Sequence, residues 1–315
     1  MALYKIEKEK ENNIRGPLKL IKTVEIIENI RKQKKYEKYL LENFITGAGH
    51  GMGRETALRF GRLGGVIVCV DINPNGNQDT VDLIKEQKGK AHRYERRLLG
   101  PRILIYNSNY RCDVTDREAV NALAEKIRVE IGEVTMLVNN AGIMPCKPLL
   151  QTSEKEIRAL FEVNIIAHLW LLQAFLPSMM ERNHGHIVAM SSMAGVVGLR
   201  NLVPYCATKF AVRGLMEALH EELREDKKDY MICPYIVDTG LCKNPKIKFP
   251  SLMKILTAQE AADSIVDAVR RNYIEITIPS SLYYINQRMP SHLRNPVSGQ
   301  CRYPKLRPVV RVSGI

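Results

Sequence analysis

A glycine-rich turn at residues 46–53 is the feature that most constrains how this chain can fold. It reads Thr-Gly-Ala-Gly-His-Gly-Met-Gly and lies between a short β-rich run at 43–45 and a helical pattern at 54–63. Glycines let the backbone turn tightly and approach a pyrophosphate, which the N–H groups of the helix N-terminus then bind. A purely structural loop is the alternative, but the position between a strand and a helix favours a dinucleotide site. The predicted contacts are Gly47, Gly49, His50, Gly51, Met52 and Gly53.

The order of a strand followed by a helix repeats along the chain. The uninterrupted apolar run at 66–70 is typical of a strand covered on both faces. Further strands are expected weakly near Ala91, then from Cys112, and at 135–138, 186–190, 230–233 and 274–278. Helices are expected at 77–88, 116–131, 153–180, 203–225 and 258–271. This alternation predicts an α/β fold with a parallel, doubly wound sheet in a single domain at 41–287.

The net charge of +13 raises the question of an anionic partner, because 47 basic side chains face 34 acidic ones. Residues 1–42 carry +4, residues 95–111 carry +3 and residues 288–315 carry +6, which leaves the rest of the chain neutral. A neutral body argues against a nucleic-acid surface, so we expect no nucleic-acid partner. Contact of the basic segments with a membrane or lipid-droplet surface stays open.

Membrane spans, secretory leaders and metal sites are not indicated. The apolar stretches at 66–70 and 165–176 are too short or too interrupted for a transmembrane segment, and the N-terminus lacks the apolar run of a leader. The seven cysteines are odd in number, scattered and free of any CxxC pair, so we expect reduced thiols and no metal.

Asp71 ends the second apolar strand, 18 residues after Gly53. A carboxylate at this point can accept hydrogen bonds from the adenosine ribose hydroxyls and would repel a 2′-phosphate. This favours NAD as the cofactor. An Asp that only caps the following turn is the alternative, and positive charge on His50 and Arg54 keeps NADP open.

Ser192, Tyr205 and Lys209 form the candidate catalytic set. Tyr205 and Lys209 are four residues apart and therefore share one helical face, and Ser192 comes just after a predicted strand, 13 residues before Tyr205. A phenol with an ordinary pKa near 10 is a poor base, but an ammonium about 4 to 6 Å away lowers that pKa. Ser191 is the alternative hydroxyl, and the family resemblance described next implies the interval from Ser192 instead.

These motifs together resemble those of the short-chain dehydrogenase/reductase family. The pattern TGxxxGxG is followed by Cys-Asp-Val-Thr-Asp at 112–116, NNAG at 139–142, the Ser192 to Tyr205 interval and PxxVxTG at 234–240. Within the family the chain is most similar to the group that holds 17-beta-hydroxysteroid dehydrogenases of types 11 and 13 and epidermal retinol dehydrogenase 2. The resemblance covers about residues 44–284 and implies a Rossmann-type fold.

The resemblance also implies the role of each residue. The enzyme would oxidise a lipophilic alcohol such as a steroid, retinol or fatty alcohol, with Tyr205 as general base, Lys209 as its cation, Ser192 orienting the substrate oxygen and Asn164 holding a water in a proton relay. Asp113 and Val114 would contact the adenine, and Asn140, Ala141 and Gly142 would line the cofactor cleft. Near the nicotinamide the expected contacts are Pro234, Val237 and Thr239, besides Tyr205 and Lys209. A homo-oligomer, dimer or tetramer, and a mobile substrate lid at 243–253 are also implied.

Three segments depart from the family pattern. Removing residues 95–110 would join Tyr94 to Arg111 and restore the expected third strand, so we predict an insertion there. The basic extension at 1–40 offers only an amphipathic helix near 18–30. The resemblance implies that relatives carry an apolar anchor for endoplasmic reticulum or lipid-droplet membranes in this region. We expect the chain on the cytoplasmic side. The basic tail at 288–315 is predicted to be disordered.

Two rival functions stay open at this point. One is an NADP-dependent carbonyl reductase on the same scaffold. The other is a dinucleotide-binding module with little turnover, which the insertion and the altered ends would explain. The complete set of Ser192, Tyr205 and Lys209 argues against the second.

Overall fold

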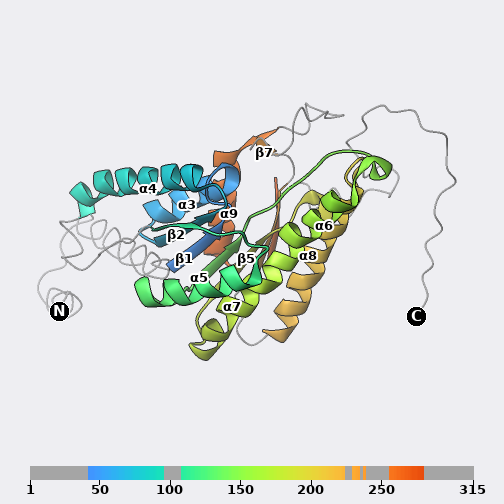
Figure 1. Ribbon diagram of the computed structural model, residues 1–315. Helices are drawn as coiled ribbons and strands as arrows, with labels where there is room; N and C mark the ends of the chain where they lie inside the picture. The colour runs from blue at the N-terminus through green and yellow to red at the C-terminus, as the bar shows by residue number, and fades with distance from the viewer. Residues whose placement is uncertain (1–41, 96–107, 224–228, 235–236, 239–254, 280–315) are drawn as a thin grey trace, which may run out of the picture.

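A seven-stranded parallel sheet forms the centre of the molecule (Figure 1). The computed structural model describes residues 42–95, 108–223, 229–234, 237–238 and 255–279. The strand order is β3-β2-β1-β4-β5-β6-β9, so the order reverses between β1 and β4. The strands are β1 (Glu42–Thr46), β2 (Val66–Asp71), β3 (Ser108–Arg111), β4 (Met136–Asn139), β5 (His186–Met190), β6 (Asp229–Pro234) and β9 (Glu275–Ile278). The predicted α/β class and doubly wound sheet are confirmed.

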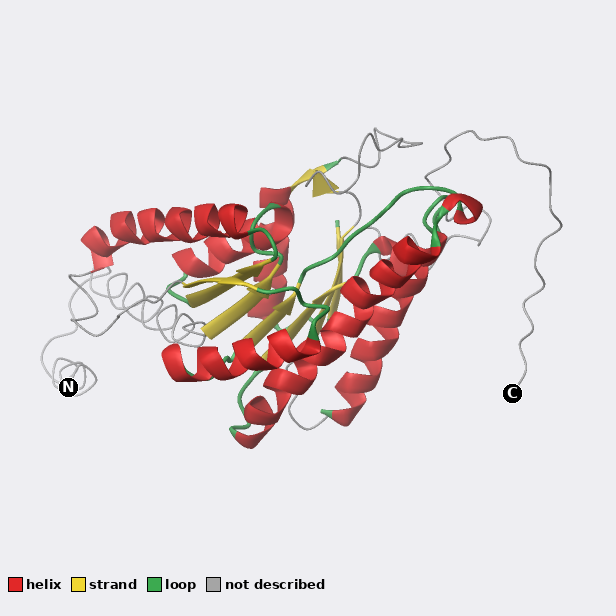
Figure 2. Cartoon of the chain, in the orientation of Figure 1, coloured by secondary structure: helices red, strands yellow, loops and turns green. Residues whose placement is uncertain are grey.

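Helices cover both faces of the sheet (Figure 2). One face packs against α5 (Arg117–Glu130), α7 (Ala167–Glu181) and α8 (Val203–Glu222), with Phe44 and Leu137 buried between them. The other face packs against α3 (Gly51–Arg62), α4 (Pro74–Glu95) and α9 (Ala258–Arg271), with Ile45 and Val138 buried there. Successive residues of a strand point to opposite faces, so a strand that is covered on both faces is apolar on both, as residues 66–70 of β2 show.

Local signals in the sequence set where several helices begin. Asp116 caps α5 by accepting a hydrogen bond from the Ala119 N–H. Ser153 with Glu156 caps α6 (Glu154–Phe161), and Thr257 with Glu260 caps α9, each as a reciprocal capping box. A short parallel pair, β7 (Val237–Asp238) and β8 (Leu256–Thr257), precedes α9 and was not foreseen.

The long helix predicted at 153–180 is interrupted by a π-helical turn, η2 (Glu162–Ile166). The whole run Glu154–Glu181 is long and apolar enough to cross a membrane by length and composition. Here its second half packs on the sheet, with Leu171 and Phe175 buried in the core. Burial of this kind is a sufficient reason for the apolar composition of the helix.

The strand predicted near Ala91 is wrong, because those residues continue α4 to Glu95. The third strand is β3, in which Ser108, Asn109 and Tyr110 belong to the segment predicted as an insertion. Pairing explains the difference: Tyr110 lies opposite Val70, is buried, and donates a hydrogen bond of 2.6 Å to Glu130 of α5. The insertion itself stays a prediction, since residues 96–107 lie outside the described residues, as do 1–41 and 280–315.

Candidate active site

The glycine-rich turn is bound to the NNAG turn through Thr46, the last residue of β1. The Thr46 hydroxyl accepts hydrogen bonds of 3.0 Å from the backbone N–H groups of Asn140 and Ala141. The Asn140 amide in turn donates to the carbonyl of Thr46 at 2.8 Å and to that of Gly47 at 3.3 Å. These bonds join the ends of β1 and β4 where the strand order reverses, the place where open α/β sheets bind ligands.

Gly53 is required by a close backbone approach. A Cβ atom on Gly53 would lie 2.1 Å from the carbonyl oxygen of Gly47, a separation that real Cβ atoms do not tolerate. The first turn of α3 therefore packs directly under the glycine-rich turn. His50 precedes this helix without a side-chain cap, which leaves the N–H groups of its first turn for a ligand.

Asp71 braces the glycine-rich turn as well as facing the cleft. One carboxylate oxygen accepts a 2.8 Å hydrogen bond from the Gly49 N–H, and the other accepts one of 2.9 Å from the Asn73 N–H. The Arg54 guanidinium binds the carbonyls of Gly49 and Gly76, so its charge holds the same turn in place. Asp71 therefore caps the following turn and also lines the cavity, so the two interpretations of this residue do not exclude each other.

A cavity of about 500 Å³ opens beside these residues. Seven of the predicted cofactor contacts line this cavity. Other residues that the sequence did not single out, among them Ile72 and Glu162, line it as well. Cys112 also lines it, and burial raises the pKa of this thiol to about 11, with the charges of Asp113 and Asp116 adding to the effect. The thiol is therefore protonated at neutral pH and is no nucleophile. The predicted contacts in the lining are Gly47, His50, Asp71, Asp113, Val114, Ala141 and Gly142.

The candidate catalytic side chains lie at the carboxyl edge of the sheet. Tyr205 and Lys209 are both buried in the first half of α8, and the Lys209 ammonium lies 5.7 Å from the centre of the Tyr205 ring. The ammonium donates a 2.7 Å hydrogen bond to the Met190 carbonyl at the end of β5. Ser192 comes two residues after the end of β5 and caps η3 (Met193–Gly195), which packs against α8. Lys209 is thus held beside Tyr205 by α8, on which both residues lie, and by its hydrogen bond to the end of β5.

Asn164 lies in the π-helical turn and is fully buried. Its side chain exchanges two hydrogen bonds of 2.9 Å with the backbone of Ile143 and donates a third, of 3.2 Å, to the Thr208 hydroxyl. These are bonds to distant segments, so the alternative of a local helix bond does not apply. π-Helical turns occur often at functional sites. The Asn164 side chain thus links Ile143, which directly follows the NNAG turn, to Thr208 of α8, the residue before Lys209.

Sequence reasoning missed two supporting residues, Gly195 and Thr208, and it weighed Ser191 only as a catalytic hydroxyl. The Ser191 hydroxyl donates a 3.0 Å hydrogen bond to the Lys209 carbonyl, which gives this serine a structural role. A Cβ on Gly195 would lie 2.5 Å from the same carbonyl oxygen. No spacing rule marks Gly195 or Thr208, because their importance arises only from the contact of η3 and η2 with α8.

The remaining predicted contacts are placed less fully. Gly51 begins α3, and Met52 in its first turn packs toward Leu256. Pro234 ends β6 and Val237 begins β7, whereas Thr239 and the predicted lid at 243–253 lie outside the described residues. Their contacts with a cofactor or substrate stay predictions.

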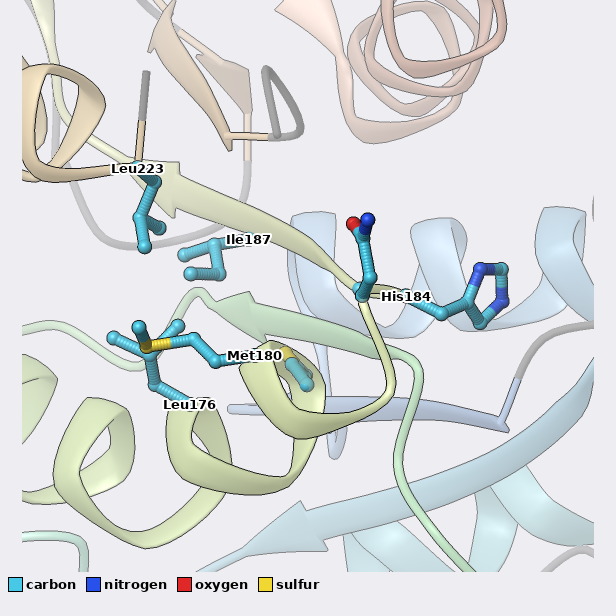
Figure 3. A pocket seen from close by; sticks show the side chains of 8 residues that line it. Leu176, Met180, His184, Ile187 and Leu223 are labelled. Atoms are coloured by element: carbon cyan, nitrogen blue, oxygen red, sulfur yellow. The ribbon is translucent and has the colours of Figure 1, made fainter. Parts of the chain in front are cut away.

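A second pocket, of about 30 Å³, lies near the start of β5, at the opposite edge of the sheet (Figure 3). Its walls are mainly Leu176, Met180, Ile187 and Leu223, and the ring of His184 points away from them. Within the described part of the chain no group of three or more His, Cys, Asp or Glu side chains could hold a metal ion. The large cavity instead carries polar side chains such as His50, Asp71 and Asp113, while Ser192, Tyr205 and Lys209 are not among its lining residues.

Together the doubly wound sheet, the glycine-rich turn and the Ser-Tyr-Lys set define a nucleotide-dependent oxidoreductase. The model of the family described as short chain dehydrogenase matches residues 105–247. Epidermal retinol dehydrogenase 2 of Mus musculus is 38% identical over 76% of this chain and 74% of its own length. The 17-beta-hydroxysteroid dehydrogenase 13 of Homo sapiens is 38% identical over 77% of this chain and 75% of its own length. The chain belongs to the short-chain dehydrogenase family.

A solved structure supports the same fold. A short chain dehydrogenase/reductase from Burkholderia phymatum in complex with NAD superimposes with a TM-score of 0.67 at 24% identity, covering 83% of this chain and 99% of that one. The expected resemblance to the retinol and 17-beta-hydroxysteroid dehydrogenases is confirmed. The protein is an NAD(P)-dependent oxidoreductase.

Proposed function

We propose that the protein oxidises a lipophilic primary or secondary alcohol with NAD. The observation that carries this proposal is the buried Lys209 ammonium, fixed 5.7 Å from the Tyr205 ring at the edge of the sheet that carries the cavity. A buried cation favours the phenolate over the phenol, which makes Tyr205 a usable base near neutral pH.

The residues around the cavity fit a dinucleotide. Gly47 and His50 at the start of α3 suit the pyrophosphate, and Asp71 lines the same cavity where the adenosine ribose would lie. The Asp71 carboxylate has lone pairs beyond its two backbone hydrogen bonds with which to accept from ribose hydroxyls. The same negative charge disfavours the 2′-phosphate of NADP, and the charge of Arg54 is shared with two carbonyl groups.

Each catalytic side chain has one task in this proposal. Ser192 donates a hydrogen bond to the substrate oxygen, and Tyr205 takes the hydroxyl proton onto its phenolate oxygen as the carbonyl bond forms. Lys209 stabilises that phenolate, while Asn164 fixes the backbone of Ile143 and, as the family resemblance implies, holds a water in the proton relay. When bound, the nicotinamide supplies the acceptor for the hydride, so the two electrons of the C–H bond leave with it.

An apolar wall beside Tyr205 supports a lipophilic substrate. Leu160, Ala194 and Cys206 are buried around Tyr205, and Ile143, Met144, Leu199 and Leu202 pack against this cluster while remaining partly exposed. A wall of this composition suits an aliphatic or isoprenoid chain better than a sugar or an amino acid. The names of the two relatives, a retinol dehydrogenase and a hydroxysteroid dehydrogenase, point the same way.

A substrate panel tests the proposal. The full chain is incubated with NAD or NADP and with retinol, a steroid alcohol, a long-chain alcohol and glycerol, and reduced cofactor is followed by absorbance. We expect turnover of one of the lipophilic alcohols with NAD, weaker turnover with NADP, and a loss of about 10² to 10⁴-fold in kcat for Tyr205→Phe. Binding of NADH without turnover of any alcohol, unchanged by Tyr205→Phe, would favour the binding module.

We also assign the outer face of α7 and α8 to contact with a second copy of the chain. A groove of about 380 Å³ there is lined mainly by apolar residues, and Leu169 and Met180 remain 39% and 54% exposed. An exposed apolar groove of this kind is typical of a protein–protein interface. Sedimentation should show a dimer or tetramer that Leu169→Asp dissociates; a wild-type monomer at micromolar concentration contradicts the assignment.

A further inference from the structure

His168 is a buried titratable residue to which the proposed mechanism gives no role. It lies on α7, is 2% exposed, and neither ring nitrogen has a hydrogen-bond partner within the described chain. Buried polar groups are nearly always satisfied, so an imidazole with two unpartnered nitrogens requires a reason. Leucine or phenylalanine would fill the same space without that cost.

A second unpartnered group lies in the same layer. The side-chain oxygen of Asn139, the last residue of β4, is also buried without a partner. Asn139 is two residues after Leu137 and therefore points to the same face of the sheet, where Leu137 packs with α7 residues such as Leu171. Since α7 packs against β4, both unpartnered groups are directed into the layer between α7, α8 and the sheet.

Lys209 lies next to this layer. His168 follows Asn164 by four residues along the helical run, and Asn164 is bonded to Thr208, the neighbour of Lys209. The Lys209 ammonium is held at the Met190 carbonyl, at the end of the strand that pairs with β4. The ends of β4, β5 and the two helical segments thus surround one small buried region.

The charge state of His168 follows from its surroundings. Burial and, to a smaller extent, the charge of Lys209 lower its pKa to about 3, so the ring is neutral at working pH and one nitrogen is an acceptor. Lys209 on α8 is the charged group of the described chain that acts on it. β4 presents the uncharged Asn139 to it, Arg117 of α5 lies over Trp170, and Glu162 of η2 is exposed.

We propose that His168 is a positioning residue for Lys209, and that it acts through a buried water held jointly with Asn139. The water accepts a hydrogen bond from the Lys209 ammonium and donates to the Asn139 oxygen and to the acceptor nitrogen of His168. Three polar partners are what a buried water ordinarily has. The neutral ring thereby stabilises the ammonium in the position from which it acts on Tyr205.

The proposal rests on the proposed alcohol oxidation, and two variants test it in the full chain. His168→Phe keeps a planar ring, although a somewhat larger one, and removes the acceptor, whereas His168→Gln keeps an acceptor. With the best alcohol of the panel and NAD, His168→Phe should raise the pKa that limits kcat by about half to one unit, with KM nearly unchanged. The kcat below that pKa should fall about three- to tenfold, and His168→Gln should restore most of it.

Phe175→Leu is the matched packing control, because Phe175 is buried on the same helix in the same core. It should lower the melting temperature and leave the pH profile unchanged. A wild-type profile in His168→Phe, or an equal shift in Phe175→Leu, overturns the proposal.

A crystal structure that resolves ordered water decides the question independently of turnover and of the folding of the variants. We expect one water within hydrogen-bonding distance of Lys209, Asn139 and His168, and a dry site overturns the proposal. If no alcohol is oxidised, the proposed function fails while this structural result still stands or falls by itself.

Discussion

The two halves of the cleft are built in different ways. In the nucleotide half, the backbone of the glycine-rich turn takes part in every contact. The Gly49 N–H bonds to Asp71, the carbonyls of Thr46 and Gly47 accept from Asn140, and Gly53 lies close against Gly47. The catalytic half is held by buried side chains, in which Asn164, Thr208, Ser191 and Lys209 bridge separate segments. Backbone approach requires glycine at fixed positions, whereas a side-chain network depends on which elements meet.

Breaking the backbone contact should have the largest effect. Gly53→Ala places a methyl group against the Gly47 carbonyl, so either the turn or α3 must shift. We expect the free energy of unfolding to fall by about 3 kcal/mol and NAD binding to weaken at least tenfold, measured by denaturant titration and calorimetry.

Gly214→Ala is the matched control for that change. A Cβ on Gly214 meets open space inside α8, so the variant should be unchanged or more stable by up to about 1 kcal/mol. If both glycine variants behave alike, the close approach does not organise the nucleotide half.

Acid should act on the catalytic half through His168. The pKa of His168 is lowered to about 3 in the folded state, and its ordinary value is about 6.5. Between these values the unfolded chain binds the proton and the folded protein does not, so this contribution to stability is lost as pH falls from about 6.5 toward 3. The expected loss is about 1.4 kcal/mol per pH unit in that window.

Unfolding free energies of wild type and His168→Gln at pH 7, 6 and 5 measure this contribution. The free energy of unfolding of the wild type should fall relative to that of His168→Gln as the pH is lowered, because glutamine does not titrate. Parallel pH curves would show that His168 is not buried as a neutral ring.

The smallest effect separates the two neighbouring serines. Ser191→Ala removes one buried hydrogen bond to the Lys209 carbonyl and should cost about 1 kcal/mol of stability, with kcat within a few-fold of wild type. Ser192→Ala makes the same chemical change one residue later and removes the hydroxyl that accepts from the Ala194 N–H, so it should also cost about 1 kcal/mol of stability, but it should lower kcat by about 10²-fold or more. The reverse result would exchange the two assignments.

The difference between the halves also explains what the sequence could predict. The glycines, Asp71 and the pair of Tyr205 and Lys209 were predicted because local geometry fixes residue type or spacing, whereas Ser192 was predicted from the family resemblance. The parallel, doubly wound sheet and most element boundaries to within a few residues followed from the alternation of strands and helices.

The misses have physical causes. The third strand was placed near Ala91 because local pattern does not tell a weak strand from the end of a helix, and pairing of Tyr110 with Val70 decides it. Thr46, Thr208, Gly195 and His168 act only through contacts between distant segments. The π-helical turn at Asn164 likewise has no signature in a helical apolar pattern.

The proposed transfer of hydride at the catalytic half is tested most directly with an alcohol deuterated at the carbinol carbon. The best lipophilic substrate of the panel is oxidised by the wild-type chain with NAD, and the reduced cofactor is examined by mass spectrometry and NMR. We predict one deuterium at nicotinamide C4, and no deuterium there when unlabelled alcohol is oxidised in heavy water. Reduced cofactor without the label, or with label drawn from the solvent, would contradict direct hydride transfer at this site.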